Sequence, residues 1–129
     1  MKVKGFTLIE LMVVILIVGI LAAASVPMMR GRIDSAKWSE ANATAGTIKS
    51  AVRVYFAEHG SAPTGVLSNG TTQTLLGFTA ADLTGTYFVP GDYNITAVNT
   101  DGQATVAVTG SQTNAPTGTK TLSATGSWN

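Results

Sequence analysis

One apolar stretch near the N-terminus constrains this chain more than any other feature of its sequence. Residues 6–29 are 24 consecutive residues in which Glu10 is the only ionisable side chain. With a rise of about 1.5 Å per residue, a helix of this length spans about 36 Å, which exceeds the hydrocarbon core of a bilayer at about 30 Å. The stretch therefore predicts a helix that crosses a membrane.

A secretory signal peptide is the main alternative for this end of the chain. Lys2 and Lys4 would form its basic region, and the three alanines at 22–24 offer a cleavage site. The apolar region of such a peptide is uncharged and about 7–15 residues long, whereas this run is longer and carries Glu10 near its start. Cleavage after Ala24 would release a soluble secreted binding module without Glu10. An ionisable group inside a membrane usually has a function and pairs with another polar or charged group. We therefore expect Glu10 to have such a partner.

An amphipathic pattern after the apolar run predicts that the helix continues. Apolar side chains recur at helical spacing at Ala41, Ala45, Ile48, Val52 and Phe56. Gly60 and Pro63 are stop signals, so the helix should end near His59. We expect a joint between Gly19 and Pro27, because proline lacks an N–H and clashes with the carbonyl four residues earlier.

The spacing of apolar residues changes to two after residue 83. Residues 86–89, 93–98 and 104–109 alternate apolar and polar side chains between turn signals, and residues 120–128 are expected to return as a fourth strand. Residues 60–83 predict an ordered loop with few regular elements. The expected fold class is α+β. A long N-terminal helix, through its second half at 30–59, packs on an antiparallel sheet of three to four strands formed from residues 84–129, within a globular head of residues 30–129.

Composition and spacing argue against several kinds of functional site. The chain has no cysteine, a formal net charge of +1, and eight dispersed basic residues, so no disulfide and no nucleic-acid partner is indicated. His59 is the single histidine, and no serine stands in a catalytic motif, so we predict no catalytic residue, no metal site and no enzyme activity. We expect no cofactor. Calcium bound through Asp82, Asp92 and Asp101 is an alternative to turn and cap roles for these residues.

The first 29 residues resemble the processing and assembly segment of type IV pilins and type II secretion pseudopilins. The resemblance rests on a short basic leader, Gly5 before Phe6, Glu10 as the fifth residue from Phe6 onward, and the unbroken apolar run. It implies that a prepilin peptidase removes residues 1–5 by cutting between Gly5 and Phe6, and that it methylates the new amine of Phe6. It also implies that Glu10 pairs with this amine on a neighbouring subunit, with Thr7 adding a hydrogen bond.

The resemblance further implies a structural function. The chain would be the major pilin of a type IV pilus, polymerising through residues 6–29 into a filament for adhesion, motility or DNA uptake. The alternative is the major pseudopilin of a type II secretion system. Implied partners are other copies of the chain, the prepilin peptidase, an inner-membrane assembly platform, and membrane lipid before assembly. The precursor would cross the bacterial inner membrane once with its head in the periplasm, and the filament would be extracellular.

One feature of the C-terminus departs from many pilins. Those proteins close the C-terminal region of the head with a cysteine pair, which this chain lacks. We therefore expect the packing of Trp128 and the strand pairing of residues 120–127 to close the head instead.

Overall fold

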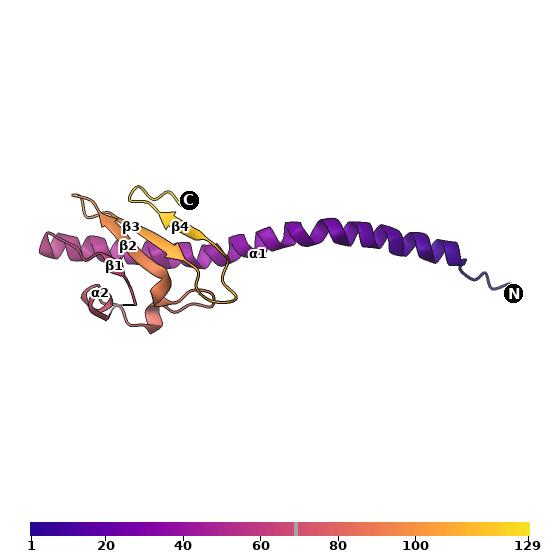
Figure 1. Ribbon diagram of the computed structural model, residues 1–129, viewed down its shortest axis with the longest axis horizontal. Helices are drawn as coiled ribbons and strands as arrows, with labels where there is room; N and C mark the ends of the chain where they lie inside the picture. Colours follow the sequence, from indigo (N-terminus) through magenta and orange to yellow (C-terminus); the bar gives the residue numbers. More distant parts are fainter. Residues whose placement is uncertain (69) are drawn as a thin grey trace. The chain divides into compact units, whose positions relative to one another are not determined.

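The structure is a computed structural model, which describes residues 1–68 and 70–129. They form two compact units, Met1–Ser35 and Ala36–Asn129. Helix α1, Leu8–His59, contributes residues to both units. The predicted α+β class is confirmed, because this long helix is followed by a four-stranded antiparallel sheet (Figure 1).

The first unit consists of an irregular segment, residues 1–7, and the N-terminal part of α1. All residues of this unit are exposed. Pro27 lies inside α1, and the helix is continuous from Gly19 through Pro27. Ser25 lies within this segment, and its Oγ donates a hydrogen bond to the Leu21 carbonyl at 2.8 Å. The structure thus holds the region as helix, and a joint there stays a prediction.

The second unit, called the head below, contains the sheet and three short helices. The sheet has the order β1-β2-β3-β4, and all neighbouring strands are antiparallel. Its strands are β1 (Gly65–Val66), β2 (Tyr93–Val98), β3 (Ala104–Thr109) and β4 (Thr119–Leu122). The short helices are α2 (Gly70–Leu75), η1 (Ala81–Leu83) and η2 (Pro90–Asp92). The segment expected as a loop thus contributes an edge strand and two of these helices.

The expected strand at residues 86–89 is wrong. These residues have no strand structure, and Val89 directly precedes η2. The Glu40 carboxylate on α1 accepts hydrogen bonds from the main-chain N–H groups of Thr86, Tyr87 and Phe88, at 3.0 to 3.3 Å. Alternation of apolar and polar side chains therefore does not produce a strand at residues 86–89, because the side chain of Glu40 binds the N–H groups that strand pairing would need.

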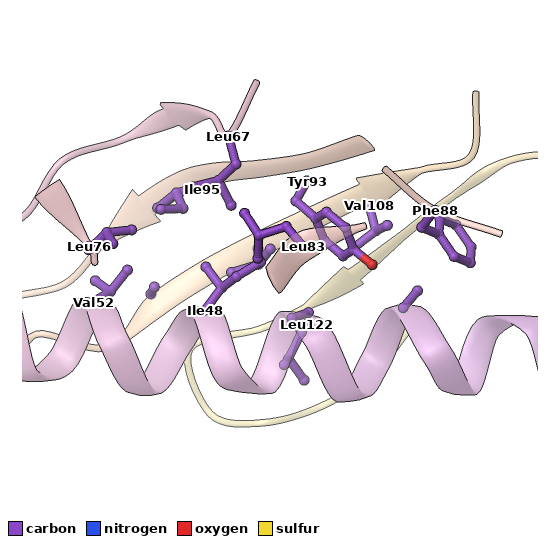
Figure 2. Close-up of a cluster of buried hydrophobic side chains, with 14 of the residues drawn as sticks. Ile48, Val52, Leu67, Leu76, Leu83, Phe88, Tyr93, Ile95, Val108 and Leu122 are labelled. Carbon is purple, nitrogen blue, oxygen red and sulfur yellow. The ribbon is translucent and has the colours of Figure 1, made fainter. Parts of the chain in front are cut away.

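The core of the head lies between one face of α1 and the inner face of the sheet. The helix contributes Trp38, Ala41, Ala45, Ile48 and Val52, all buried. Figure 2 shows Ile48 and Val52 pointing from α1 toward residues of the opposing layer, including Tyr93, Ile95 and Val108. The predicted Phe56 is half-buried and lies over Gly102, where an added Cβ would come within 2.6 Å of the ring. Gly102 also has φ +74°, a left-handed conformation that favours glycine.

Noncovalent contacts tie down the C-terminus. Main-chain bonds pair Thr121 with Asn129 in both directions, at 2.8 and 3.1 Å. The Trp128 ring packs edge-on against Trp38, with ring centroids 6.0 Å apart. Lys49 Nζ donates to the carbonyls of residues 123 and 124 at 2.6 and 3.0 Å, and burial lowers the pKa of this lysine. Helix and sheet contacts therefore hold the segment that lacks a disulfide.

Candidate functional site

The start of α1 is closed by a reciprocal pair of hydrogen-bonding residues, Thr7 and Glu10. The Glu10 carboxylate accepts the Thr7 N–H at 2.8 Å and the Thr7 hydroxyl at 2.7 Å. The Glu10 N–H in turn donates to the Thr7 Oγ1 at 3.3 Å. This is a capping box, in which two main-chain N–H groups at the helix start gain partners. The T-x-x-E spacing of this capping box is present in the sequence at residues 7–10.

Gly5 and Phe6 lie in the irregular segment before this cap. Both residues are exposed, and the Phe6 side chain is 82% exposed. A Cβ added at Gly5 would meet no other atom within 4 Å. The peptide bond between them is therefore open to another protein, and it lies directly before the capped helix.

The apolar side chains that follow have no cover within the described residues. Every large apolar side chain from residue 6 to residue 29 is between 48% and 82% exposed. Helix α1 is long and apolar enough, by length and composition, to cross a membrane. Fully burying one such side chain is favourable by about 1.5–3 kcal/mol, so lipid or apolar protein surface stabilises this segment strongly over water.

The structure places Gly19 and Pro27 two turns apart within this uncovered segment. No side chain lies within 4 Å of a Cβ built at Gly19. Since Pro27 has no N–H, the Ala23 carbonyl lacks its usual helical donor. Helix stability is thus weakest here by local chemistry, although the segment is helical throughout.

Asp82 and Asp92, two of the acidic residues considered for calcium, accept hydrogen bonds within the head. Asp82 accepts the N–H and hydroxyl of Thr79 at 2.7 and 2.6 Å, and these bonds lower its pKa. Asp92 is buried and accepts the N–H groups of Val89 and Ser111 at 3.0 and 3.1 Å. Residues 1–68 and 70–129 contain no cluster of three or more potential metal-binding side chains. These two acids therefore act as local caps, while Asp101 lies in the β2–β3 turn.

His59 is at the C-terminal end of α1 and packs on the same helix. Its ring stacks on Tyr55 with centroids 4.1 Å apart and an interplanar angle of 11°. Its Nδ1 lies 3.0 Å from the Tyr55 carbonyl, an arrangement in which Nδ1 carries the proton and donates. This contact accounts for the histidine as a helix-end residue.

Comparison with known proteins agrees with this geometry. Residues 1–26 match the family model described as the prokaryotic N-terminal methylation motif. A fimbrial protein of Neisseria meningitidis is 51% identical over 67 residues, which are 52% of this chain and 39% of that protein. Over about half of its length, the chain is therefore similar to type IV pilins. The chain is also similar to a type IV major pilin protein of Neisseria gonorrhoeae, with 51% identity over 52% of this chain and 41% of that protein.

A pilus protein of another bacterium is also similar to this chain. The type IV narrow pilus major component PilA5 of Thermus thermophilus is 42% identical over 64 residues, covering 50% of this chain and 55% of PilA5. The chain thus spans between about two fifths and about half of the length of these relatives. No solved structure matches it significantly.

Proposed function

We propose that this chain is the major structural subunit of a type IV pilus. The observation that carries the proposal is the uncovered apolar surface of residues 6–29, which begins at a capped, ionisable Glu10. Such a surface is stable in a bilayer, and it can also be buried against the same surface of other copies. Relatives named as fimbrial protein, major pilin and pilus major component support the second state as the working form.

Proteolytic processing would convert the membrane-bound precursor into a subunit that packs against other copies. A prepilin peptidase cuts between Gly5 and Phe6, which are exposed, and methylates the amine of Phe6. The cut removes Lys2 and Lys4, which would hold the leader at the anionic cytoplasmic face of the inner membrane. The apolar helix stays in the product, and the head is periplasmic before assembly. An inner-membrane platform then moves subunits from lipid into the extracellular filament.

Glu10 would set the register between subunits. The capping box holds its carboxylate at the N-terminal end of α1, on Thr7. The cut at Phe6 creates a positive charge one residue before Thr7. In the filament, Glu10 of one copy pairs with the Phe6 amine of a neighbour, while Thr7 keeps its hydrogen bond to the carboxylate. A buried charge with a partner is tolerated, whereas one without a partner is strongly disfavoured, so the pair selects the register.

The segment from Gly19 to Pro27 would be the extensible part of the filament core. The Ala23 carbonyl without a helical donor lowers the free-energy difference between helix and extended chain at this point. Melting a few residues would lengthen the core without separating the heads from one another. The filament would serve adhesion, motility or DNA uptake, a structural function without catalysis.

Mass spectrometry of the N-terminal peptide tests the proposal. Two fractions of the native host are compared, sheared extracellular material and washed cells. We expect N-methylated Phe6 to be abundant in the sheared fraction. The same terminus confined to cells would indicate a pseudopilus, and a terminus at Ser25 or an intact Met1 would refute processing as a pilin.

A further inference from the structure

Two grooves run along α1 in the head. The first, called the C-terminal groove, is a cavity of about 290 Å³ between α1, the β2–β3 turn and the C-terminal segment from Leu122 onward. Its lining includes Lys49, Ser50, Arg53, Gln103 and Leu122. The second, called the α2 groove, has a volume of about 340 Å³ and lies between α1 and α2. Its lining includes Val54, Tyr55, Glu58, Leu75 and Leu76.

The two grooves lie on different flanks of the head. Arg53 and Glu58 are five residues apart on α1, so their directions differ by about 140° around the helix axis. The C-terminal groove lies at the β4 edge of the sheet, through Leu122, and the α2 groove lies toward the opposite edge, where β1 precedes α2. In Figure 1, β4 and the C-terminus lie on one side of α1, and α2 lies on the other. One head therefore presents two different flanking surfaces.

These grooves differ in charge and in polarity. The C-terminal groove carries two cations, Lys49 and Arg53, and no acid among its lining residues. The α2 groove carries Glu58 as its one charged lining residue, beside Val54 and Leu75, which are 59% and 45% exposed. The two grooves are thus complementary in charge, and the α2 groove also has apolar side chains that are exposed to solvent.

Most charged side chains of the head are already engaged within it. Internal partners hold Lys37, Glu40, Lys49, Asp82, Asp92 and Lys120. In the described part of the head, Arg53, Glu58 and Asp101 have no side-chain hydrogen bond, ion pair or ring contact. Of these three residues, Arg53 lies in the C-terminal groove and Glu58 lies in the α2 groove.

We propose that these grooves are the lateral contact between the heads of successive subunits, with Arg53 of one copy paired with Glu58 of the next. The inference rests on the proposed function, because only a polymer brings many heads together. A contact between two different flanks is heterologous and repeats without closing, as a filament requires. Lys49 adds positive potential at the same groove, and Val54 and Leu75 become buried. Opposite charges on the two flanks also disfavour contact between two like flanks.

Charge reversal in the full-length chain tests this contact, in the native host without its own copy of the gene. Sheared filament is quantified for the wild type, Arg53→Glu, Glu58→Arg, and the double variant. Each single reversal places like charges together, and we expect filament yield to fall about tenfold or more. The double variant restores the opposite pair, so its yield should return to within about threefold of the wild type. Single variants with unchanged yield, or a double variant no better than the singles, would overturn the contact.

A matched control separates this pair from a general charge effect. Arg53→Glu combined with Asp101→Arg has the same net charge as the restoring double variant, but it reverses an acid outside both grooves. Its yield should stay as low as that of Arg53→Glu, and restoration would overturn the assignment of Glu58. Immunoblots of whole cells measure the amount of precursor, so that filament yields are compared at equal precursor levels. Absence of filaments of this chain from the wild type would refute the proposed function itself. A filament yield that does not depend on the charges at residues 53 and 58 would refute only the contact.

Cross-linking gives a second readout that leaves Arg53 and Glu58 in place. The chain has no cysteine, so Ser50→Cys in one groove and Leu75→Cys in the other create the only thiols. A long, flexible bis-maleimide applied to filaments of the double variant should give a ladder of many subunits, and neither single variant should do so. A ladder absent from the double variant, or dimers from a single variant, would contradict contact between different flanks.

Discussion

The carboxylate of Glu40 accepts the main-chain N–H of Tyr87 at 3.0 Å, and so joins α1 to a loop 47 positions later in the chain. Thr86 and Phe88 donate to the same carboxylate at 3.2 and 3.3 Å. Gly85 lies against this carboxylate, where any side chain would collide with it. The Gly85 N–H also bonds the Phe88 carbonyl at 2.8 Å, which folds the loop around the anion. One helical residue thereby determines the path of the chain between η1 and η2.

Removal of this carboxylate should destabilise the head. Glu40→Ala leaves three N–H groups without their acceptor, and hydrogen bonds to charged groups are each favourable by about 1.5–3 kcal/mol. Because water reaches part of this loop, we expect a loss of about 2–4 kcal/mol in the free energy of unfolding, measured by urea titration of the full chain in detergent. The control is Glu58→Ala, an exposed acid, which should change this free energy by less than about 0.5 kcal/mol.

Gly85 and Glu40 should be energetically coupled. Gly85→Ala alone forces the carboxylate out of its position and should cost about as much as Glu40→Ala. In the Glu40→Ala background the collision disappears, so the added cost of Gly85→Ala should be small. A double-mutant cycle measures this, and additive losses would show that the two residues act independently.

The buried Tyr93 hydroxyl should make stability depend on alkaline pH. The side chain is fully buried, and its hydroxyl has no hydrogen-bond partner among the described residues. Burial is the main cause that raises the pKa of Tyr93 to about 12. The negative charges of Glu40 and Asp92 act in the same direction, and Thr44, whose hydroxyl falls short of hydrogen-bond geometry, partly opposes the shift. The folded state therefore holds the proton more tightly than the unfolded chain.

The consequence is a specific pH window. The folded state gains stability from the tightly held proton of Tyr93. This contribution is fully present below the ordinary tyrosine pKa near 10, and it is lost as pH rises through about 12. Tyr93→Phe should remove this decline in melting temperature. At neutral pH the variant should be as stable as the wild type or more stable, because it no longer buries an unpaired hydroxyl. If the melting temperature of Tyr93→Phe declines above pH 10 as steeply as that of the wild type, the alkaline loss of stability comes from another group.

Trp128 should stabilise the C-terminal closure. It packs on Trp38 and pairs across a bridge with Leu122, while Lys120 lies 5.8 Å from the centre of its ring. Trp128→Ala should lower the free energy of unfolding by about 1–3 kcal/mol, less than for a fully buried tryptophan. Limited proteolysis should also cut residues 119–129 sooner. Unchanged thermal stability would reject Trp128 as the closing residue, and Val54→Ala serves as the exposed control.

Removal of divalent cations should leave the head unaffected. The Asp82 carboxylate accepts the main-chain N–H of Thr79, and the Asp92 carboxylate accepts those of Val89 and Ser111, so calcium would have to compete with these donors. The melting temperature should be the same in EDTA and in millimolar calcium. A calcium-dependent rise would support the calcium site and would favour a secretion pseudopilin.

Local patterns in the sequence predicted most of the fold. Helical spacing identified the buried face of α1 from Ala41 to Val52, and alternation identified β2 and β3 with the bounds that the structure has. Both signals come from burial on one face of a regular element, which is repeated along the chain. The path of residues 84–89 was not predictable in this way, because it depends on Glu40, more than 40 residues away.

The candidate site was predicted in a different way. Gly5, Phe6 and Glu10 were found through their spacing and resemblance, and their processing and pairing stay predictions. The structure added the hydrogen bonds between Thr7 and Glu10, a local capping motif that the sequence already contained. It also brought Arg53 and Glu58 to two different grooves. That placement could not be read from the sequence, because the grooves are formed by α2, by the β2–β3 turn and by the C-terminal segment.

Electron cryomicroscopy of filaments sheared from the native host tests whether residues 6–29 form the core of a filament. We expect the map to contain this chain beginning at Phe6, with residues 6–29 of successive copies packed as the apolar core and the heads outside. Glu10 should lie next to the Phe6 amine of a neighbour. Filaments built from another protein, or a core that excludes residues 6–29, would contradict the account.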